Sequence, residues 1–353
     1  MAAAASPLVL YISGHGWGHA SRAIELLDAM APRAPDLRLL VRTAVNPALL
    51  ARTARARLEL HAGETDTGIV QLDSLTMDEE ETARCAARFY REFDARVDRE
   101  AAFLAEQHAS LVVADVPPLA IAAAARAGIR SVLVSNFTWD WIYQAYPTFE
   151  RLAPGVVARI ADAYARATLA LRLPLHGGFA STQAVTRDIP FIARRSRRPR
   201  EEIRQALAIP PRRPAVLVSF GAYGADLPLD AIRASGAVTI VDEEAGFAAG
   251  FRYEDLVAAV DLVISKPGYG IVSECIANGT PLLYTSRGRF VEYDLMVAEM
   301  PRYLRCRFIA QEDLRAGRWG NAIEALLRQP PPPEQPRVDG ADVAADAIVA
   351  LLR

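Results

Sequence analysis

The sequence predicts an α/β protein made of two domains, each built around a parallel sheet. In both halves of the chain, short apolar runs of strand length alternate with stretches of helical length, which is the pattern of strands joined by crossover helices. An arginine-rich stretch, residues 194–200, separates the two series. The chain has 353 residues, of which 52% are hydrophobic and 23% charged, and this is enough to fill two ordinary cores.

The first domain is expected to comprise residues 1–193. Its predicted strands are short apolar runs bounded by polar or turn-forming residues. They lie at 8–12, 37–42, 57–61, 111–115 and 131–135. A helix is expected at 20–30, directly after the first strand, and residues 77–107 are predicted to form one exposed helix or a pair.

The second domain is expected to comprise residues 201–330 and to repeat the alternation. Its predicted strands lie at 215–220, 237–241, 261–266 and 281–284. Four consecutive prolines, residues 330–333, form a stiff spacer. Residues 338–353 are then predicted as one last helix.

Charge and cysteine content narrow the class of protein. The net charge is −2, so no global field attracts nucleic acid, which is not expected as a partner. The three cysteines, Cys85, Cys275 and Cys306, lack the spacing of a zinc site or a disulfide framework. The first residues do not resemble a secretory signal, and no apolar stretch approaches the ~20 residues of a membrane span. A cytoplasmic location is therefore expected.

Basic residues are distributed unusually. Lys266 is the single lysine beside 39 arginines, and five of the seven residues in 194–200 are arginine. A compact ammonium at Lys266 is compatible with a specific site and equally with chance. The arginine-rich stretch is interpreted as the linker between the domains; it is compatible with a solvated hinge and with a peripheral contact to anionic lipid or a phosphate.

The first predicted strand is followed by a glycine-rich turn that carries two histidines, His15 and His19. In an open α/β sheet, ligands gather at the carboxyl ends of the strands. Glycine allows close approach of the backbone to a ligand, and histidine moves protons near neutral pH. The turn is therefore a candidate for catalysis, although its histidines could also bond only to local backbone.

A second cluster follows the strand at 131–135. Residues 136–146 contain five aromatic side chains, which either pack in a core or form the wall of an acceptor pocket. The candidates for acceptor binding in the first domain are Trp17, Asn136, Trp139 and Asp140.

Features of the second domain converge on a nucleotide diphosphate. The strand at 215–220 runs into a turn with Gly221, Tyr223 and Gly224, whose backbone N–H groups could meet phosphate. Phe251 could lie against a planar base, although packing explains this residue equally well.

The segment 265–281 carries the strongest motif: a strand end, a glycine-rich turn, a helix, and a Gly-Thr-Pro sequence after the helix. Lys266 lies at the start of the turn. The turn residues are Gly268, Tyr269 and Gly270. The free N–H groups and the dipole of the following helix favour phosphate oxygens here.

Further candidates for donor binding lie in the helix of this motif and in the segment after the next predicted strand. Glu274, in the helix, could accept hydrogen bonds from ribose hydroxyls. The segment 286–293 could present Arg289 to phosphate and Glu292 to sugar hydroxyls, with surface charge as the alternative for both.

These motifs resemble those of glycosyltransferases of the GT-B class. The segment 265–281 is similar to the donor signature of the peptidoglycan N-acetylglucosaminyltransferase, in which a glutamate that matches Glu274 binds ribose. His19 matches the catalytic base of the UDP-glycosyltransferases of plant secondary metabolism, and Asp115 matches the aspartate that orients it. The resemblance implies a GT-B fold: two Rossmann-like domains facing across a cleft, with the helix 338–353 completing the first domain.

A closer resemblance links residues 13–22 and 135–143 to the glycosyltransferase-like N-terminal region of plant L-arabinokinases. The sugar-kinase domain of those proteins has no counterpart in this sequence, so arabinokinase activity is not expected. This second resemblance keeps a non-catalytic sugar-nucleotide-binding module open as an alternative.

The resemblances imply transfer of a sugar from a nucleotide donor, a UDP-sugar, to an unidentified acceptor hydroxyl. His19 would be the general base, Asp115 its orienter, and His15 an acceptor ligand or the base instead. The reaction would invert the anomeric configuration. No metal is expected, because the sequence shows no Asp-x-Asp pair that would suggest a metal-bound diphosphate. No cofactor is expected either, since the nucleotide sugar is a substrate. A sugar-nucleotide 2-epimerase is the remaining alternative; all five histidines precede the linker, which disfavours it.

Overall fold

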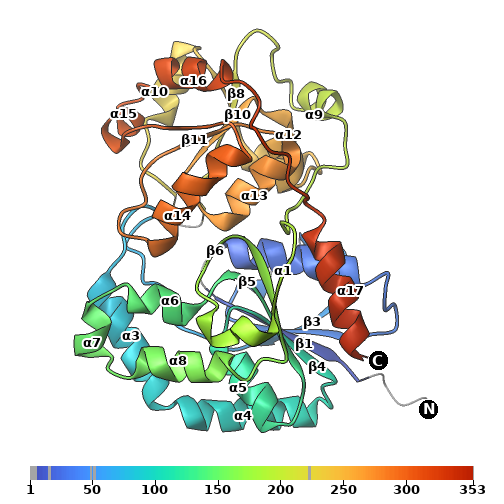
Figure 1. Ribbon diagram of the computed structural model, residues 1–353. Coiled ribbons are helices and arrows are strands. Elements are labelled where there is room, and N and C mark those ends of the chain that lie inside the picture. Colours follow the sequence, from blue (N-terminus) through green and yellow to red (C-terminus); the bar gives the residue numbers. More distant parts are fainter. Residues whose placement is uncertain (1–5, 15–16, 48–49, 51–52, 222–223, 353) are drawn as a thin grey trace. The chain divides into compact units, whose positions relative to one another are not determined.

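The computed structural model describes residues 6–14, 17–47, 50, 53–221 and 224–352, which divide into two compact units (Figure 1). Unit 1 is made of Met1–Val70, Asp78–Ile192 and Asp339–Arg353. Unit 2 is made of Gln71–Met77 and Ala193–Val338. The chain thus enters unit 2 and returns within its first hundred residues, a crossing that the predicted domain limits did not include.

The described part of unit 1 contains a seven-stranded sheet in the order β3-β2-β1-β4-β5-β6-β7. The strands are β1 (Leu8–Ile12), β2 (Leu39–Thr43), β3 (Leu58–Ala62), β4 (Leu111–Asp115), β5 (Ser131–Phe137), β6 (Leu169–Gly177) and β7 (Thr186–Asp188). All neighbouring strands run parallel. The strand order reverses between β1 and β4, so the loops that follow these two strands diverge and leave a binding position at their carboxyl ends.

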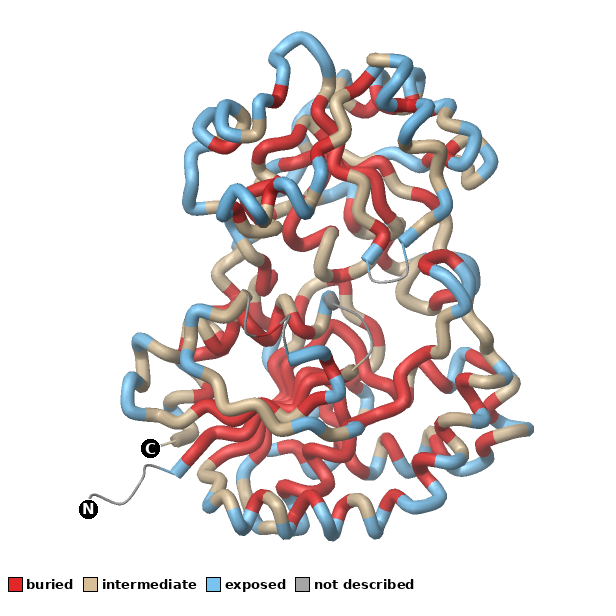
Figure 2. The backbone as a smooth tube through the Cα atoms, turned by 180° about the vertical axis from the view of Figure 1, so that it is seen from behind, coloured by how far each residue is buried: buried red, intermediate tan, exposed pale blue. Residues whose placement is uncertain are grey.

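Helices connect and cover the strands of unit 1 (Figure 1). They are α1 (Trp17–Met30), α3 (Glu79–Arg91), α4 (Phe93–Glu106), α5 (Pro118–Arg126), α6 (Trp139–Gln144), α7 (Thr148–Leu152), α8 (Val156–Tyr164), the 3-10 helix η1 (Ala180–Val185) and α17 (Gly340–Leu352). Strands β1, β4 and β5 are buried throughout. Along α3 and α4 buried and exposed residues alternate (Figure 2), as expected for amphipathic helices with one face on the core.

Unit 2 is described with a five-stranded parallel sheet in the order β12-β11-β10-β8-β9. The strands are β8 (Ala215–Val218), β9 (Thr239–Val241), β10 (Leu262–Ser265), β11 (Leu282–Tyr284) and β12 (Cys306–Phe308). The helices are α9 (Arg200–Ala206), α10 (Leu229–Ser235), α11 (Glu243–Ala248), α12 (Tyr253–Ala259), α13 (Tyr269–Asn278), α14 (Val291–Glu299), η2 (Met300–Arg302), α15 (Gln311–Arg315) and α16 (Gly320–Leu327). Here the strand order reverses between β8 and β10, which brings the loops after these strands to one sheet edge.

The segment Gln71–Met77 is anchored in unit 2 by its side chains. Leu75 belongs to the apolar core around β8 and β10. Ser74 donates a 2.6 Å hydrogen bond to the Phe220 carbonyl. Within the segment, the Leu75 N–H donates to Asp73 Oδ1 at 2.7 Å. A stretch of first-half sequence therefore forms part of the unit that carries the predicted donor site.

The last helix, α17, begins at a position where only glycine fits. The Gly340 N–H donates to the Phe191 carbonyl at 2.9 Å, and a methyl group on Gly340 would overlap the carbonyl oxygens of Pro190 and Phe191. Further along, Arg33, in the turn after α1, forms ion pairs with Asp342 and Asp346. The close backbone approach fixes where α17 starts against the rest of unit 1.

Substituting Gly340→Ala is expected to lower the free energy of unfolding of unit 1 by about 1–3 kcal/mol, because the backbone must move to admit the methyl group. Gly320→Ala is the matched control: it lies at the start of helix α16, and no heavy atom lies within 4 Å of the position that a Cβ would take there, so alanine should be neutral or stabilising. Urea denaturation followed by circular dichroism compares the variants. Equal midpoints for Gly340→Ala and the parent chain would show that α17 does not dock as described.

Candidate functional site

The switch point of unit 1 brings together His19 and Asp115. Asp115 is the last residue of β4, and His19 lies in the first turn of α1, which follows β1. His19 Nδ1 lies 2.8 Å from Asp115 Oδ1. The His19 side chain is 14% exposed, against 3% for Asp115. The predicted pair is thus assembled, with an aspartate that is inaccessible and a histidine that reaches the surface.

A third residue, Arg22, completes this cluster and was missing from the sequence prediction. Its Nε donates to Asp115 Oδ2 at 2.9 Å, and its Nη2 donates to Oδ1. Its Nη1 donates to Asn136 Oδ1 at 2.9 Å. The signal was available, since Arg22 ends the stretch 13–22 and lies one helical turn after His19.

Asp115 is held as a carboxylate by its two neighbours. Burial alone raises the pKa of this carboxyl, but the charge of Arg22 and the hydrogen bonds from His19 and Arg22 outweigh burial, and the pKa lies below its usual range. An ionised carboxylate only accepts hydrogen bonds, so the proton of a neutral His19 is assigned to Nδ1. The lone pair then lies on Nε2, which is the atom a general base requires.

The predicted acceptor residues are buried in unit 1 and bonded to its interior. Asn136 accepts from Arg22, as above, and the Trp139 indole N–H donates to Asp66 at 2.9 Å. Asp140 accepts from Ser181 at 2.7 Å through one oxygen, while its other oxygen is buried without a hydrogen-bond partner among the described atoms. Trp139 stacks on Tyr143 with ring centroids 5.2 Å apart. These contacts favour a supporting role beneath the site.

Two predictions in unit 1 concern residues that are not described in full. His15 lies outside the described residues, and Trp17 is described only as the first residue of helix α1, without its side chain. Their assignment as base or acceptor ligands stays a prediction.

In unit 2 the predicted phosphate turns follow the adjacent strands β8 and β10. Gly221 and Gly224 both have positive φ, 73° and 61°, a conformation that glycine adopts without strain. Ser265, at the end of β10, donates to the Ser219 carbonyl after β8, which ties the two turns together. Tyr223 lies outside the described residues.

The helix α13 starts at the second turn, and its first N–H groups have no carbonyl of the same helix to bond. Gly268 is its N-terminal cap, with extended backbone, and Tyr269 and Gly270 form its first turn. A cationic side chain, Arg287, lies beside this cap: its Nη1 is 4.0 Å from the position that a Cβ would take on Gly268. The predicted Arg289 is exposed, and Glu292 in α14 is half-buried. Arg287 belongs to the segment 286–293 that the sequence analysis selected, although that analysis named Arg289 as the phosphate ligand.

Lys266 lies between the turn and the segment Gln71–Met77. Its Nζ donates to Gln71 Oε1 at 3.5 Å. Burial lowers the pKa of this ammonium, the charge of Arg287 lowers it further, Asp73 opposes the shift, and the resulting pKa is about 7. A partly desolvated cation beside a helix N-terminus is well suited to an anionic ligand.

Glu274 is engaged by an arginine of the linker. Arg194 donates from Nε to Glu274 Oε1 at 2.7 Å, and its Nη1 lies 3.7 Å from Glu254 Oε2. The side chains of both glutamates are 4% exposed. For Glu274 to bind ribose, as the resemblance implies, it would have to share its carboxylate with Arg194 or release it.

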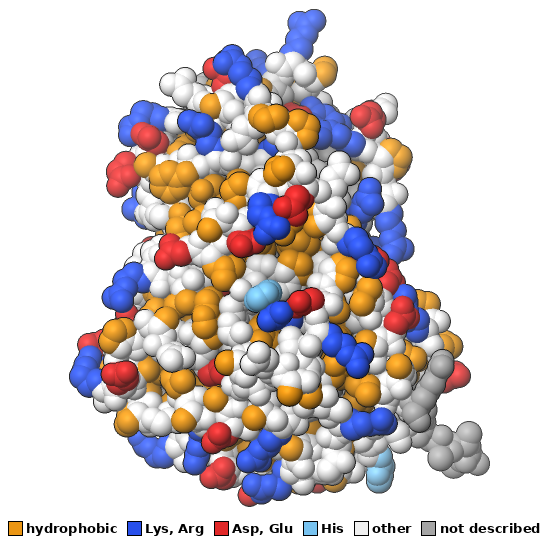
Figure 3. All heavy atoms as spheres, viewed as in Figure 1, with side chains coloured by type: hydrophobic (Ala, Val, Ile, Leu, Met, Phe, Trp, Pro, Cys, Tyr) orange, Lys and Arg blue, Asp and Glu red, His pale blue; other side chains and the backbone are white. Residues whose placement is uncertain are grey.

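The arginine-rich stretch is bound along unit 2. Arg198 lies over the Phe251 ring at 5.0 Å, so Phe251 is buried against a cation, and Arg200 pairs with Asp261. Together with Arg194, three of the arginines have acidic or aromatic partners. On the face shown in Figure 3, basic and acidic side chains are interspersed. Contact with an anionic membrane stays a prediction that depends on Arg195 and Arg197, which are exposed.

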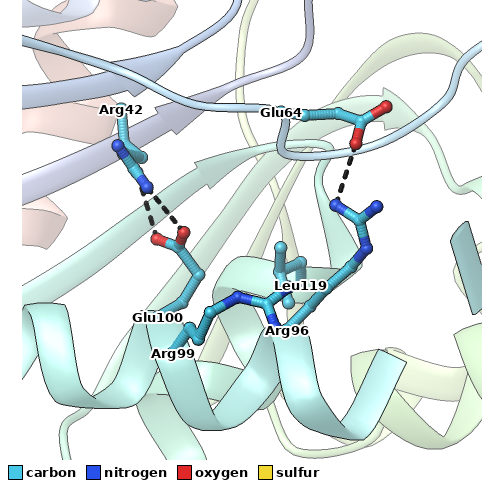
Figure 4. Close-up of a pocket in the computed structure, with 6 residues that line it drawn as sticks. All are labelled: Arg42, Glu64, Arg96, Arg99, Glu100 and Leu119. Atoms are coloured by element: carbon cyan, nitrogen blue, oxygen red, sulfur yellow. Dashed lines mark hydrogen bonds and ion pairs between the residues drawn. The ribbon is translucent and has the colours of Figure 1, made fainter. Parts of the chain in front are cut away.

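A cavity of about 160 Å³ lies in unit 1, and none of the predicted site residues lines it (Figure 4). Its lining consists of Arg42, Glu64, Arg96, Arg99, Glu100 and Leu119. Arg42 pairs with Glu100 and Arg96 with Glu64, both at 2.8 Å. The ion pairs satisfy most of this charge internally, so the cavity offers little to a ligand.

Neither a metal cluster nor a membrane span was found in the part of the chain that is described. No group of three His, Cys, Asp or Glu side chains there could hold a metal ion. Within the same residues, no helix has the length and apolar character needed to cross a bilayer.

Comparison with known proteins gives a related sequence and many related folds. No protein-family model matches the chain. The L-arabinokinase of Arabidopsis thaliana is 29% identical over 359 residues, a match that covers 96% of this chain and 34% of that protein. The chain therefore spans about a third of the length of this relative.

Solved glycosyltransferase structures match over nearly the whole chain. The calicheamicin glycosyltransferase CalG4 has a TM-score of 0.62 at 17% identity, covering 99% of this chain and 98% of its own. UGT71G1 of Medicago truncatula, complexed with UDP-glucose, has a TM-score of 0.62 at 10% identity, covering 99% and 98%. UGT2 of Phytolacca americana, complexed with UDP-2fluoro-glucose and pterostilbene, has a TM-score of 0.60 at 12% identity, covering 98% and 94%. These matches confirm the predicted GT-B fold and the predicted resemblances.

Proposed function

We propose that the protein is a glycosyltransferase that moves a sugar from a nucleotide donor, a UDP-sugar, to an acceptor hydroxyl. The observation that carries the proposal is the His19–Asp115 pair at the switch point of unit 1. The GT-B fold supports it, as do the UDP-glucose and UDP-2fluoro-glucose bound in two of the matching structures. At these low identities the matches support the fold, and the activity rests on the residues of this chain.

The proposed reaction is a single displacement. His19 Nε2 takes the proton of the acceptor hydroxyl while the acceptor oxygen forms a bond to the anomeric carbon of the donor sugar. The bond from that carbon to the diphosphate oxygen breaks, and the electron pair leaves with the diphosphate. Attack opposite the leaving group inverts the anomeric configuration. Asp115 stabilises the imidazolium through Nδ1 and keeps the ring oriented.

Charge that develops on the leaving diphosphate is proposed to be stabilised in unit 2. Lys266, Arg287 and the N–H groups at the start of α13 lie at one sheet edge. Such preorganised cations and dipoles stabilise a leaving phosphate oxygen without a metal ion. A metal-independent reaction without a cofactor is therefore part of the proposal.

The affinity for the nucleotide sugar is expected to fall as the pH rises from about 6.5 to 8.5. Bound diphosphate favours the ammonium form of Lys266, whose pKa in the free protein is about 7. Below this pH the group already carries its proton; above it, binding must take up a proton, which costs up to ~1.4 kcal/mol per pH unit. Isothermal titration with a nucleotide sugar measures this dependence, because its phosphodiester groups do not titrate in this range.

Lys266→Arg provides the control for the pH dependence. A guanidinium keeps its charge over the whole range, so the affinity of this variant should be insensitive to pH. An equal slope in Lys266→Arg and the parent protein would exclude Lys266 as the titrating ligand.

The donor class is tested by the thermal midpoint of the purified protein with a panel of nucleotides and nucleotide sugars. We expect UDP or one UDP-sugar to stabilise selectively, by ~2.7 kcal/mol at a concentration a hundredfold above Kd. Lys266→Met should lose most of this stabilisation. Stabilisation by no nucleotide would contradict the donor site in unit 2, and selective stabilisation by another base would replace UDP in the proposal.

A further inference from the structure

Arg22 is a buried cation that the proposed proton transfer does not use. Its side chain is 3% exposed, although guanidinium groups are rarely buried without a specific partner. Through its three nitrogens it binds both oxygens of Asp115 and the side-chain oxygen of Asn136. One arginine of α1 is thereby bound to two neighbouring strands, β4 and β5.

The contacts of Arg22 determine the ionisation of Asp115. Burial is the largest influence on this carboxyl and raises its pKa; the charge of Arg22 is the largest influence that lowers it. Without the guanidinium, the buried carboxylate would lose its closest full charge and would be stabilised by taking up a proton. The hydrogen bond to His19 alone would have to maintain the negative charge.

The ionisation of Asp115 in turn determines which nitrogen of His19 carries the proton. A carboxylate accepts from Nδ1–H and leaves Nε2 with its lone pair. A protonated Asp115 would instead donate to Nδ1 and place the imidazole proton on Nε2. If the carboxyl proton of Asp115 were transferred to Nδ1, His19 would become an imidazolium, and Nε2 would still be protonated.

We propose that Arg22 is a positioning residue: it keeps Asp115 a hydrogen-bond acceptor and thereby keeps the lone pair of His19 on Nε2. The relevance to catalysis rests on the proposed function, since only a general base needs that lone pair. Arg22 Nη2 lies 3.3 Å from His19 Nδ1, so both donors share Asp115 Oδ1. This sharing places the guanidinium beside the ring it influences.

The bond to Asn136 gives Arg22 a second, geometric part in the site. Asn136 precedes Phe137, whose ring meets the His19 ring edge-on with centroids 5.8 Å apart. The planar fork of arginine satisfies Asp115 and Asn136 together; a lysine at this position supplies the charge without the fork. Charge and geometry can therefore be separated by substitution.

The test is NMR spectroscopy of the full-length protein with ¹⁵N-labelled histidine at pH 8.5, without donor or acceptor. His19→Gln identifies the His19 signals among those of the five histidines. In the parent protein we expect Nδ1 protonated and Nε2 unprotonated. In Arg22→Met we expect the Nε2 signal to change to the protonated type, and in Arg22→Lys we expect the parent pattern to be retained by the charge.

Arg33→Met is the matched control, because Arg33 belongs to the same region of the chain and pairs with Asp342 and Asp346, away from this cluster. It should leave the His19 signals unchanged. If Arg22→Met does not fold, as judged by circular dichroism, Arg22→Gln carries the test, since it keeps a hydrogen-bond donor near Asp115 without the charge.

An unprotonated Nε2 in folded Arg22→Met or Arg22→Gln, which both lack the positive charge, would overturn the proposal. A protonated Nε2 in the parent protein would overturn it too. A role in packing alone predicts no change of the proton position in any folded variant. Because the spectra need no substrate, the result stands whether or not the protein transfers sugar, and the failure of one proposal is distinguishable from the failure of the other.

Discussion

Replacing His19 by alanine is expected to reduce the rate of sugar transfer by about 10²–10⁴-fold, the usual contribution of a general base. The affinity for the nucleotide donor should be unchanged, because the proposed donor ligands belong to unit 2. Initial rates of nucleoside diphosphate release measure the first effect, and isothermal titration measures the second. Free energies derived from the two measurements separate loss of catalysis from loss of binding.

His61→Ala is the control for this experiment. His61 lies on β3, edge-on to Phe103 with ring centroids 5.3 Å apart, and has no part in the proposed site. It should retain the parent rate. Loss of donor affinity in His19→Ala, or transfer at the parent rate, would exclude His19 as the base.

Replacing Arg194 by alanine is expected to lower the free energy of unfolding of unit 2 by about 3–5 kcal/mol, the cost of removing one member of a buried ion pair. Arg194 is 13% exposed and engages two glutamates that are 4% exposed, Glu274 and Glu254. Its guanidinium also lies 5.3 Å from the centre of the Tyr253 ring. The substitution removes a charge that both carboxylates face.

Urea denaturation measures the loss of unfolding free energy. Hydrogen exchange of the α13 amides measures the loss of stability in the helix that carries Glu274. Arg198→Ala is the matched control from the same stretch: its pairing with Glu202 is exposed, and such pairs contribute at most about 1 kcal/mol. Equal exchange rates in Arg194→Ala and Arg198→Ala would show that the pairing of Arg194 with Glu274 does not stabilise α13.

Much of the fold could be predicted because its central strands are fully buried apolar runs. Strands β1 and β4 begin and end at the predicted residues, and β5, β8 and β10 differ from prediction by two residues or fewer at each end. Three strands were missed: the edge strands β7 and β12, and the nine-residue β6 beside β7. β7 and β12 have only three residues each and include charged side chains, so neither length nor alternation distinguishes them from loops.

The candidate site could be predicted where its residues lie at the carboxyl ends of strands. Asp115 ends β4 and His19 follows β1, the two strands at which the sheet order reverses, and resemblance selected the same residues. The spacing of Arg22 one helical turn after His19 indicated that the two lie close together, but the burial of Arg22 could not be predicted, because a charged residue in a surface helix is normally solvated. The pairing of Arg194 with Glu274 spans 80 positions, and no local pattern encodes such a contact.

The segment Gln71–Met77 was missed for the same reason. Its polar composition is that of an ordinary loop, and only the folded chain shows that Leu75 enters the core of unit 2 while Gln71 reaches Lys266. The single lysine was selected by composition and by its position at the start of the 265–281 motif; its neighbours became evident from the tertiary structure.

Sugar transfer itself is tested most directly by incubating the protein with the stabilising nucleotide sugar and a mixture of small hydroxyl compounds, with mass spectrometry of the products. The predicted result is release of the nucleoside diphosphate together with an acceptor heavier by one glycosyl unit, both lost in His19→Ala. Tight binding of the nucleotide sugar with no acceptor-dependent release, or release that His19→Ala retains, would contradict a glycosyltransferase that uses His19 as its base.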